Sequence, residues 1–399
     1  MSDAKGNFGP LTGVKVVDIT RALAGPICTL ILADMGAETI KIEDPVKVMP
    51  HQPGQPSMAN QPRMFERNKK SITLHLRSDK GKDVLRQLIQ WGDVLVENFR
   101  PGIMDKMGFP YSTVREINPR IIMTSISGFG QSGPYANRAA FDTVGEAMGG
   151  IMAVTGPADS PPIASGAAIG DIGAGIFGAL GTVLALYHRN STGLGQHVDA
   201  SLMESIVFFM SMNLNLLNTG QPAGKGAVFS PQRTPGCGTF LTRDGVYIVI
   251  MALTDPHWAI LTKVIGREEL PKTPGYITRA ERGKRGEEIE AMIQDWVKLH
   301  TVDEVEAIVD KAGIPYGRVM TLEDLIKDPH LRARGRVVDV DHNGKKLPIF
   351  TPYPILSATP GSIRTSWPQR SGQHNEEVYC GLLGMPNEEL MTLKKQGVI

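Results

Sequence analysis

The fold is decided by the stretch that begins Val14-Lys15-Val16-Val17-Asp18-Ile19 and ends Thr39-Ile40-Lys41-Ile42-Glu43. Both ends are short, apolar and rich in β-branched residues, which predicts two strands. Between them, Gly25-Pro26 precedes an apolar segment, and a proline at the first helical position predicts a helix over 27–35 that ends at Gly36. A strand–helix–strand unit of this kind predicts parallel strands joined by a right-handed crossover.

The same alternation continues outward from this unit. A helix is expected over 80–91, an apolar helix over 176–187, and strands over 71–76, 93–96, 120–126 and 196–200. This rhythm predicts the α/β class, with a large Rossmann-like domain whose parallel sheet is covered by helices. The segment 46–64 is rich in Pro, Gln and Met and predicts an excursion loop.

The sequence pattern changes after a predicted helix over 203–217. Gly and Pro interrupt 220–238, and shorter elements follow: strands over 245–251, 314–319 and 337–341, and helices over 256–265, 289–299 and 302–312. We therefore expect a smaller α+β domain inserted into the large one. The expected ranges are 1–220 and 323–399 for the large domain, 228–322 for the small domain, and 213–238 and about 318–330 for two linkers.

Composition argues against several classes of protein. The 399 residues carry a formal net charge of +1, so no overall field attracts nucleic acid or an anionic membrane. The apolar run Ile172–Tyr187 is short and glycine-rich for a membrane span, and we expect a buried core helix. The three cysteines show no metal-ligand or disulfide spacing, and the N-terminus lacks the apolar core of a signal peptide. These features favour a cytoplasmic protein without a bound metal.

The carboxylate of Asp171 is surrounded in sequence by small residues, in Ala167-Ala168-Ile169-Gly170-Asp171-Ile172-Gly173-Ala174-Gly175. Asp171 is expected at a helix start, where free backbone N–H groups and the positive end of the dipole favour an anion. Its small neighbours leave room for a substrate to approach, so Asp171 is a candidate nucleophile kept ionised. An ordinary N-cap aspartate is the alternative.

Three further motifs have both a functional and a structural interpretation. Gly128–Gly133 follows a strand as either an active-site loop or a plain turn. Val96–Gly102 places Asn98, Phe99 and Arg100 at a strand exit, where an aromatic ring and a cation could bind a nucleotide, or where the chain simply leaves the strand with its Asn side chain hydrogen-bonded. The cations of Asn68-Lys69-Lys70-Ser71 and Arg77 suit a polyanionic ligand, or form a solvated basic edge.

Together these pieces resemble the family III CoA-transferases, which include formyl-CoA:oxalate and carnitine CoA-transferases. The resemblance covers nearly the whole chain. It rests on segments in matching order and spacing: 13–18, 24–26, 32–43, 68–72, 96–102, 106–109, 118–120, 127–130, 170–171, 193–196 and 313–315.

The resemblance implies roles for individual residues. Asp171 falls on the catalytic aspartate, and Asp142 on an acidic position near it. The residues that fall on or beside the CoA site are Leu23, Ala24, Leu74, Arg77, Asn98, Phe99, Arg100 and Lys106. Leu23, Asp44 and the absence of a glycine run depart from the formyl-CoA enzymes, which argues against oxalate or formate as the substrate.

The implied activity is transfer of CoA from an acyl-CoA to a small carboxylic acid, through an aspartyl anhydride and an aspartyl-CoA thioester. CoA is then a substrate, and no permanent cofactor is expected. The family implies an interlocked, ring-like homodimer. A 2-methylacyl-CoA racemase is disfavoured because Phe141 stands where those relatives have a histidine, and Phe cannot carry a proton. A non-catalytic acyl-CoA-binding protein is the other alternative, and it would not need Asp171.

Overall fold

The computed structural model describes residues 9–45, 63–226, 230–231, 233–342 and 344–399. The chain divides into two compact units. The first contains residues up to 151, 164–210 and 330–399, and the second contains 152–163 and 211–329. The predicted loop at 46–64 lies almost entirely outside the described residues. The domain limits and linkers expected from the sequence stay a prediction.

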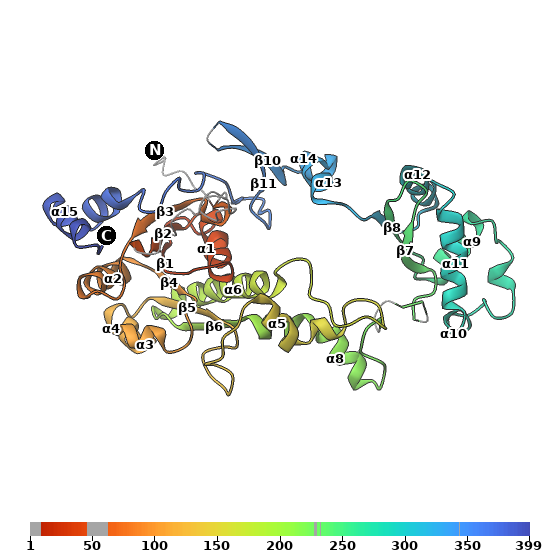
Figure 1. The fold of residues 1–399 in the computed structure, drawn as a ribbon, viewed down its shortest axis with the longest axis horizontal. Helices are drawn as coiled ribbons and strands as arrows, with labels where there is room; N and C mark the ends of the chain where they lie inside the picture. Colours follow the sequence, from red (N-terminus) through yellow and green to blue (C-terminus); the bar gives the residue numbers. More distant parts are fainter. Residues whose placement is uncertain (1–8, 46–62, 227–229, 232, 343) are drawn as a thin grey trace. The chain divides into compact units, whose positions relative to one another are not determined.

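The first unit is built on a six-stranded sheet with the order β3-β2-β1-β4-β5-β6 (Figure 1). Its strands are β1 (Lys15–Asp18), β2 (Glu38–Glu43), β3 (Lys69–Thr73), β4 (Val94–Glu97), β5 (Ile122–Ser127) and β6 (His197–Ser201). Every neighbouring pair in this sheet is parallel. The α/β class and the parallel sheet predicted from the alternating pattern are therefore confirmed.

Helices cover both faces of this sheet. The helices of the unit are α1 (Ala24–Asp34), α2 (Asp79–Trp91), α3 (Ile103–Met107), α4 (Tyr111–Ile117), α5 (Asp142–Gly149), α6 (Ile169–Thr192) and α7 (Leu202–Phe209). Alternate strand residues face opposite cores: Val17 and Leu95 pack with residues of α2, α3 and α4, whereas Val16 and Val96 pack with residues of α1 and α6. Burial of these apolar faces is what holds the layers together.

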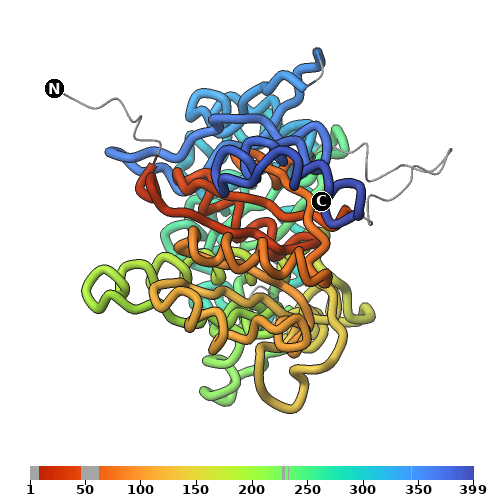
Figure 2. The backbone as a smooth tube through the Cα atoms, turned by 90° about the vertical axis from the view of Figure 1, so that its left-hand side faces the viewer, coloured from red at the N-terminus to blue at the C-terminus, as the bar shows by residue number. Residues whose placement is uncertain are grey.

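The C-terminal segment returns to the first strands of the sheet, as Figure 2 shows in blue beside red and orange. The backbone N–H of Ser71 donates to His374 Nδ1 at 2.9 Å, and that of Thr73 donates to Asn375 Oδ1 at 2.9 Å. This part contains α14 (Pro329–Ala333), which starts at the boundary of the units, a hairpin of β10 (Val337–His342) and β11 (Lys345–Phe350), a π-helix over Glu377–Leu382, and α15 (Asn387–Lys395).

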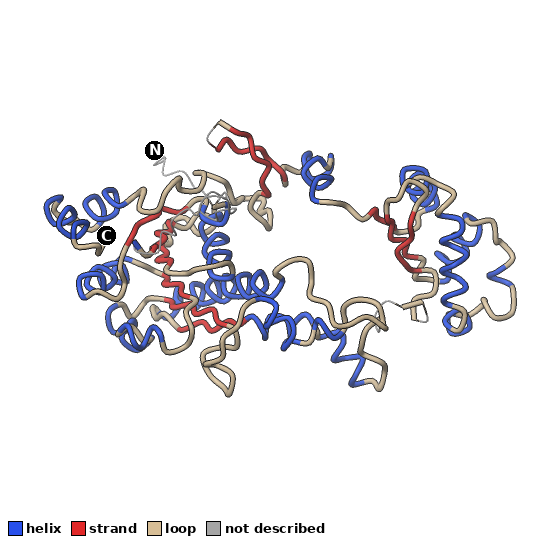
Figure 3. The backbone as a smooth tube through the Cα atoms, in the orientation of Figure 1, coloured by secondary structure: helices blue, strands red, loops and turns tan. Residues whose placement is uncertain are grey.

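The second unit has an antiparallel sheet in the order β7-β8-β9, red in Figure 3, packed against helices. Its larger elements are β7 (Cys237–Leu241), β8 (Tyr247–Met251), β9 (Tyr316–Arg318), α8 (Ser211–Asn218), α9 (Asp255–Val264), α10 (Arg279–Gly283), α11 (Gly286–Val297), α12 (Val302–Ala312) and α13 (Leu322–Lys327). Three short 3-10 helices are also present among the described residues. Met64–Glu66 lies in the first unit, Leu270–Lys272 lies in the second, and Ile151–Ala153 crosses the boundary between them. Trp258, Leu261 and Ile293 anchor the core.

Three expectations need correction. Helix α1 begins at Ala24, so Pro26 is its third residue rather than its first. The single helix expected over 203–217 is two helices, α7 and α8, which break at Met210. The apolar helix α6 is long and apolar enough to cross a membrane, but half of its most apolar window is buried inside the protein. The other half is a solvent-facing apolar stripe, so α6 is not buried on all sides as the sequence suggested.

Candidate functional site

The sheet has a topological switch point between β1 and β4. From β1 the chain proceeds to β2 and β3 on one side, while β4 leads to β5 and β6 on the other. The loops that follow β1 and β4 therefore diverge and leave a crevice at the carboxyl ends of these strands, where open α/β sheets bind ligands. Asn98, Phe99 and Arg100 lie on the loop after β4, as the sequence predicted.

Asn98 joins the two loops of the switch point. Its Oδ1 accepts the Arg21 backbone N–H and its Nδ2 donates to the Arg21 carbonyl, both at 2.7 Å. The clamp fixes a turn in which Ala22 adopts a φ of 58°, a conformation that costs a residue with a Cβ about 1 kcal/mol. Asn98 therefore acts first as a scaffold for the start of α1.

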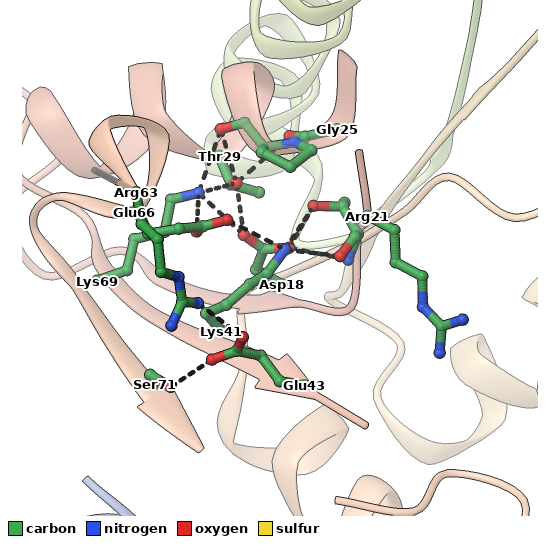
Figure 4. Close-up of polar contacts among 12 residues, drawn as sticks. Asp18, Arg21, Gly25, Thr29, Lys41, Glu43, Arg63, Glu66, Lys69 and Ser71 are labelled. Carbon is green, nitrogen blue, oxygen red and sulfur yellow. Dashed lines mark hydrogen bonds and ion pairs between the residues drawn. The ribbon is translucent and has the colours of Figure 1, made fainter. Parts of the chain in front are cut away.

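Arg21 is a candidate site residue that the sequence reasoning missed. Its half-exposed guanidinium lies 5.3 Å from the Phe99 ring centroid and 3.7 Å from the Asp44 carboxylate. In Figure 4 the side chain points away from the buried charges beside it. Its place just after a strand that ends at the switch point was the available signal.

A buried group of charged side chains lies beside the loop that follows β1 (Figure 4). Asp18 Oδ1 lies 3.1 Å from Lys41 Nζ, and Asp18 Oδ2 lies 3.2 Å from Lys69 Nζ. Lys69 Nζ also lies 2.9 Å from Glu66 Oε2, and Lys41 Nζ donates to the Thr20 carbonyl at 2.6 Å. Burial alone would raise the pKa of Asp18, but Lys41 and Lys69 more than offset it and hold that pKa well below its usual range.

Lys69 and Lys70 of β3 are therefore paired within the chain, so these two cations form neither a free polyanion site nor a solvated edge; the interpretation of Arg77 stays a prediction. Lys69 is completely buried and paired. Asn68 donates to Asp34 Oδ1 at 2.7 Å and to the Ser362 carbonyl at 2.8 Å. Lys70, which is partly exposed, pairs with Glu38 and with Glu377. A buried cation needs partners of opposite charge, and the structure supplies them within the chain.

Asp171 lies in the first turn of α6, and Asp142 lies at the start of α5. The Asp171 backbone N–H donates to Asp142 Oδ1 at 3.0 Å, so Asp142 caps α6 from a distant part of the chain. Gly170 permits this approach, because a Cβ there would lie 3.1 Å from Asp142 Oδ1. The structure thus brings together the two carboxylates that the resemblance singled out.

The helix start does not lower the pKa of Asp171. Burial, followed by the nearby Asp142 carboxylate, raises this pKa to about 6. Asp171 is then mostly ionised at neutral pH, but it is a better base than an exposed aspartate. A perturbed carboxyl group of this kind is typical of a functional site, although structural groups show such shifts as well.

The glycines after Asp171 serve helix packing rather than substrate access. A Cβ at Gly175 would lie 2.7 Å from the Ala24 carbonyl oxygen, and one at Gly178 would lie 2.8 Å from Ile126 Cδ1. Helix α6 therefore lies directly against α1 and β5. One consequence matters for the site: Ala24 touches α6 about one turn from Asp171, so the nucleophile candidate and the switch-point loops are neighbours.

The remaining predicted CoA-site residues lie in different surroundings. Leu23 is the N-cap residue of α1 and is half-buried. Leu74 follows β3 and is buried in the core, so its side chain lines no open surface. Arg77, Arg100 and Lys106 are exposed, on the loop before α2, the loop after β4 and α3 respectively. Arg77 follows β3, which is two strands away from β1 in the sheet, and its role stays a prediction.

Two backbone N–H groups of the loop Gly128–Gly133 are already engaged in hydrogen bonds within the chain. The Gly130 N–H donates to Ser127 Oγ at 3.0 Å, and the Gln131 N–H donates to Asp199 Oδ2 at 2.9 Å. Within the described ranges, no group of three or more His, Cys, Asp or Glu side chains is placed to hold a metal ion.

Comparison with known proteins identifies relatives over almost the whole length. The family model described as CoA-transferase family III matches residues 11–375. A succinyl-CoA–D-citramalate CoA-transferase of Chloroflexus aurantiacus is 37% identical, covering 98% of each chain. A formyl-CoA:oxalate CoA-transferase of Streptomyces coelicolor is 35% identical, covering 98% of this chain and 99% of that protein. A crystal structure of a CAIB/BAIF family protein from Brucella suis has a TM-score of 0.81 at 31% identity, covering 94% of this chain and 99% of that one.

Proposed function

This chain belongs to CoA-transferase family III, and from that premise we propose that it moves CoA from an acyl-CoA donor to a small carboxylic acid through covalent intermediates on Asp171. The observation that carries the proposal is the position of Asp171. It is a half-buried carboxylate at a helix start, hydrogen-bonded through its own backbone to Asp142, one helical turn from the Ala24 contact.

The proposed chemistry exchanges acyl groups without loss of the thioester's energy. The Asp171 carboxylate attacks the thioester carbonyl, the C–S bond breaks, and a mixed anhydride and CoA thiolate form. The thiolate attacks the aspartyl carbonyl and expels the donor acid, which leaves an aspartyl-CoA thioester. The acceptor carboxylate then attacks this thioester and expels the thiolate. The thiolate finally attacks the acceptor's acyl carbonyl and regenerates Asp171.

The chain's own groups favour the first step. A pKa of about 6 keeps Asp171 ionised at neutral pH while its burial leaves the carboxylate poorly solvated and hence reactive. Asp142 holds the Asp171 backbone and raises the basicity of its side chain. Phe141 precedes Asp142 and is 79% exposed, so a non-titratable ring occupies the position where a racemase would need a histidine.

The CoA moiety is proposed to bind at the switch point. Leu23 and Ala24 begin α1 and Asn98 and Phe99 follow β4, so these four lie on the two sides of the switch point, while Leu74 follows β3 two strands away. Arg77, Arg100 and Lys106 are the proposed phosphate partners, and Arg21 joins them because its guanidinium is half-exposed over Phe99. Flexible basic side chains at the surface suit a ligand with several phosphates.

We predict that Arg100→Ala or Lys106→Ala weakens CoA binding by about 1–3 kcal/mol, because a charge-assisted hydrogen bond is lost. The loss should shrink as salt rises. Lys70→Ala is the matched control, because Lys70 is a partly exposed cation of the same unit that is already paired with Glu38 and Glu377. Titration calorimetry with free CoA measures the effect. If all three variants lose the same CoA affinity, Arg100 and Lys106 only contribute to a general basic surface and are not specific phosphate partners.

The test of the overall function is a CoA-exchange assay with a substrate panel. The donors are succinyl-CoA, acetyl-CoA and formyl-CoA, and the acceptors are citramalate, malate, oxalate and formate. The departures at Leu23 and Asp44 predict weaker transfer to oxalate and formate than to the larger dicarboxylates. Formation of a new acyl-CoA without ATP supports the proposal. CoA binding without exchange for any pair would favour the non-catalytic alternative.

We also propose that two chains assemble as an interlocked homodimer and work in the cytoplasm. The support is the exposed apolar stripe on α6, which includes Ile176, Leu180, Leu184 and Tyr187 and continues on α7 at Phe208. Monomeric soluble proteins rarely expose a patch of this kind. A second copy of the chain would cover it, and a chain that leaves one domain and returns by a second linker could enclose its partner.

A further inference from the structure

A polar cavity of about 150 Å³ lies within the first unit, beside the loop after β4. The residues that line it from the sheet, from α3 and from neighbouring loops include Glu97, Arg100, Asp105, Ser125, Gln131 and His197. Three of them lie on adjacent strands: Glu97 of β4 is the register partner of Ser125 of β5, and His197 lies on β6 two residues before the register partner of Ser125. None of these three has a role in the chemistry proposed above.

Glu97 is a buried carboxyl group that holds the proposed CoA-binding loop. It is only 2% exposed, and its Oε2 accepts the Phe99 backbone N–H at 2.8 Å. Ser125 of β5 is the register partner of Glu97, and its hydroxyl lowers the pKa of the Glu97 carboxyl group. The bond from Phe99 also favours the carboxylate, because an ionised acceptor makes stronger hydrogen bonds than a neutral one. Phe99 in turn follows Asn98, which clamps Arg21.

The groups facing Glu97 do not supply a compensating cation. Asp105 of α3 and Asp199 of β6 are carboxylates, and Tyr111 of α4 is a neutral ring stacked on His197. Arg100 lines the same cavity from the loop after β4. Within the described part of the chain, neither Arg100 nor another cation forms an ion pair with Glu97. Burial is therefore the dominant cause that raises the pKa of Glu97 to about 7, and Asp199 and Asp105 add to it.

Two polar side chains lie between this carboxyl group and the surface: Ser125, its register partner, and His197. Ser125 Oγ lies 2.9 Å from His197 Nε2, and His197 is exposed. When Glu97 is ionised, Ser125 donates to Glu97 and His197 Nε2–H donates to Ser125. When Glu97 is protonated, Glu97 donates to Ser125, and Ser125 donates to an unprotonated Nε2. The buried group can thus exchange its proton with solvent without unfolding.

We propose that Glu97 is a proton-linked positioning residue for CoA binding: as a carboxylate it holds Phe99 and the loop after β4 in place, and protonation through Ser125 and His197 releases them. This inference rests on the proposed binding of CoA at the switch point. It assigns Glu97, Ser125 and His197 a function that the transfer chemistry on Asp171 does not require.

The sign of the effect follows from the hydrogen bond to Phe99. If only the ionised form holds the loop, the affinity for CoA scales with the ionised fraction, which rises about tenfold between pH 6 and pH 8 for a pKa near 7. Repulsion between the Glu97 carboxylate and the CoA phosphates would produce the opposite trend. The direction of the pH dependence therefore separates positioning from simple charge repulsion.

The experiment measures the dissociation constant of free CoA by titration calorimetry from pH 6 to pH 8, for the wild type and Glu97→Gln. Glutamine keeps an acceptor for Phe99 and a donor for Ser125 but cannot titrate. Dividing the two constants at each pH cancels ionisation of CoA itself and of Asp171. We expect the wild type to gain about tenfold in affinity relative to Glu97→Gln over this range.

Two further variants give shifts that a purely structural role would not produce. Ser125→Ala removes a donor to the carboxylate and should move the midpoint to higher pH. Asp105→Asn removes a neighbouring negative charge and should move it to lower pH. A constant ratio between wild type and Glu97→Gln, or a ratio that falls with pH, overturns the inference while CoA binding stands. Absence of CoA binding at every pH overturns the proposed function as well.

Discussion

At the scale of single residues, the account depends on two carboxylates that meet at the start of α6. Asp142 accepts the Asp171 backbone N–H at 3.0 Å, which leaves the Asp171 side chain free to react. Burial and the Asp142 charge raise the pKa of Asp171 to about 6, above the usual value of 3.8. Because the carboxylate is the proposed nucleophile, kcat/KM should fall as the pH drops through about 6.

Asp142→Asn provides a test of this pH dependence. The asparagine Oδ1 can still accept the Asp171 N–H, but the negative charge is gone, so the Asp171 pKa should fall and the acidic limb of kcat/KM should move to lower pH. Wild type measured with the same donor is the reference, which cancels ionisation of the substrate. An acidic limb that stays in place or moves upward would show that Asp142 does not set the ionisation of Asp171.

The sequence predicted the place of some candidate residues in the fold and misjudged the surroundings of others, for identifiable reasons. Asn98 and Phe99 were expected after a strand, and they follow β4 at the switch point. Lys69 was interpreted as a ligand-binding cation because the sequence does not reveal its ion pairs. Asp18 is distant along the chain, and nothing in the sequence around Glu66 marks it as a partner. Glu97 was not singled out, since only the folded sheet places it in register with Ser125. The assignment of Asp171 and Asp142 to catalysis stays a prediction.

At the scale of elements, α6 is the part of the fold that connects the proposed nucleophile Asp171 with the proposed CoA-binding loops. Its glycines let it lie against α1 so closely that side chains are excluded at the contact: a Cβ at Gly175 would lie 2.7 Å from the Ala24 carbonyl oxygen. Close helix packing of this type holds the start of α1, and with it Leu23 and Ala24, at a fixed place relative to Asp171.

We predict that Gly175→Ala destabilises the protein by about 1–3 kcal/mol and weakens CoA binding, because the added methyl group must push α1 away from α6. Gly381→Ala is the control, since a Cβ at this helical position meets nothing within 4 Å. Chemical denaturation measures the stability and calorimetry measures CoA affinity. If both variants behave alike, the α1–α6 contact does not position the site.

The elements that the sequence predicted well are those with strong local signals. The strands of the parallel sheet are short and apolar and alternate with helices along the chain. This pattern was enough to predict them from the sequence. The break between α7 and α8 at Met210 was missed because no Gly or Pro marks it. Strand β7 was missed because it lies in a segment punctuated by Gly and Pro, and its pairing with β8 is a tertiary property.

At the scale of the whole molecule, the exposed face of α6 predicts a partner. Ile176 and Leu180 are about half exposed, and Leu184 and Tyr187 are more so, although the opposite face of the same helix packs on α1 and β5. Water contact along this stripe is unfavourable, and burial against a second copy would remove it. A threaded dimer would then be kinetically stable, with little exchange of subunits.

Ile176→Glu should therefore prevent or weaken dimer formation, because a charge would be buried in an apolar interface. Met391→Glu is the control, since Met391 of α15 is equally exposed but lies outside the stripe. Sedimentation at several concentrations measures the assembly state. A wild-type monomer would contradict the dimer. Mixed dimers that form within minutes between two tagged preparations would contradict interlocking but leave the chemistry intact.

The central claim, that Asp171 carries the acyl group and then CoA, is tested most directly by trapping. The protein is incubated with succinyl-CoA and hydroxylamine, digested, and analysed by peptide mass spectrometry. Hydroxylamine attacks an activated aspartyl carbonyl and leaves a hydroxamate on that residue, which an ordinary carboxylate does not form. We predict a hydroxamate at Asp171 that depends on the acyl-CoA and disappears in Asp171→Asn. A hydroxamate on a different residue, or an unmodified Asp171 in a preparation that transfers CoA, would contradict the account.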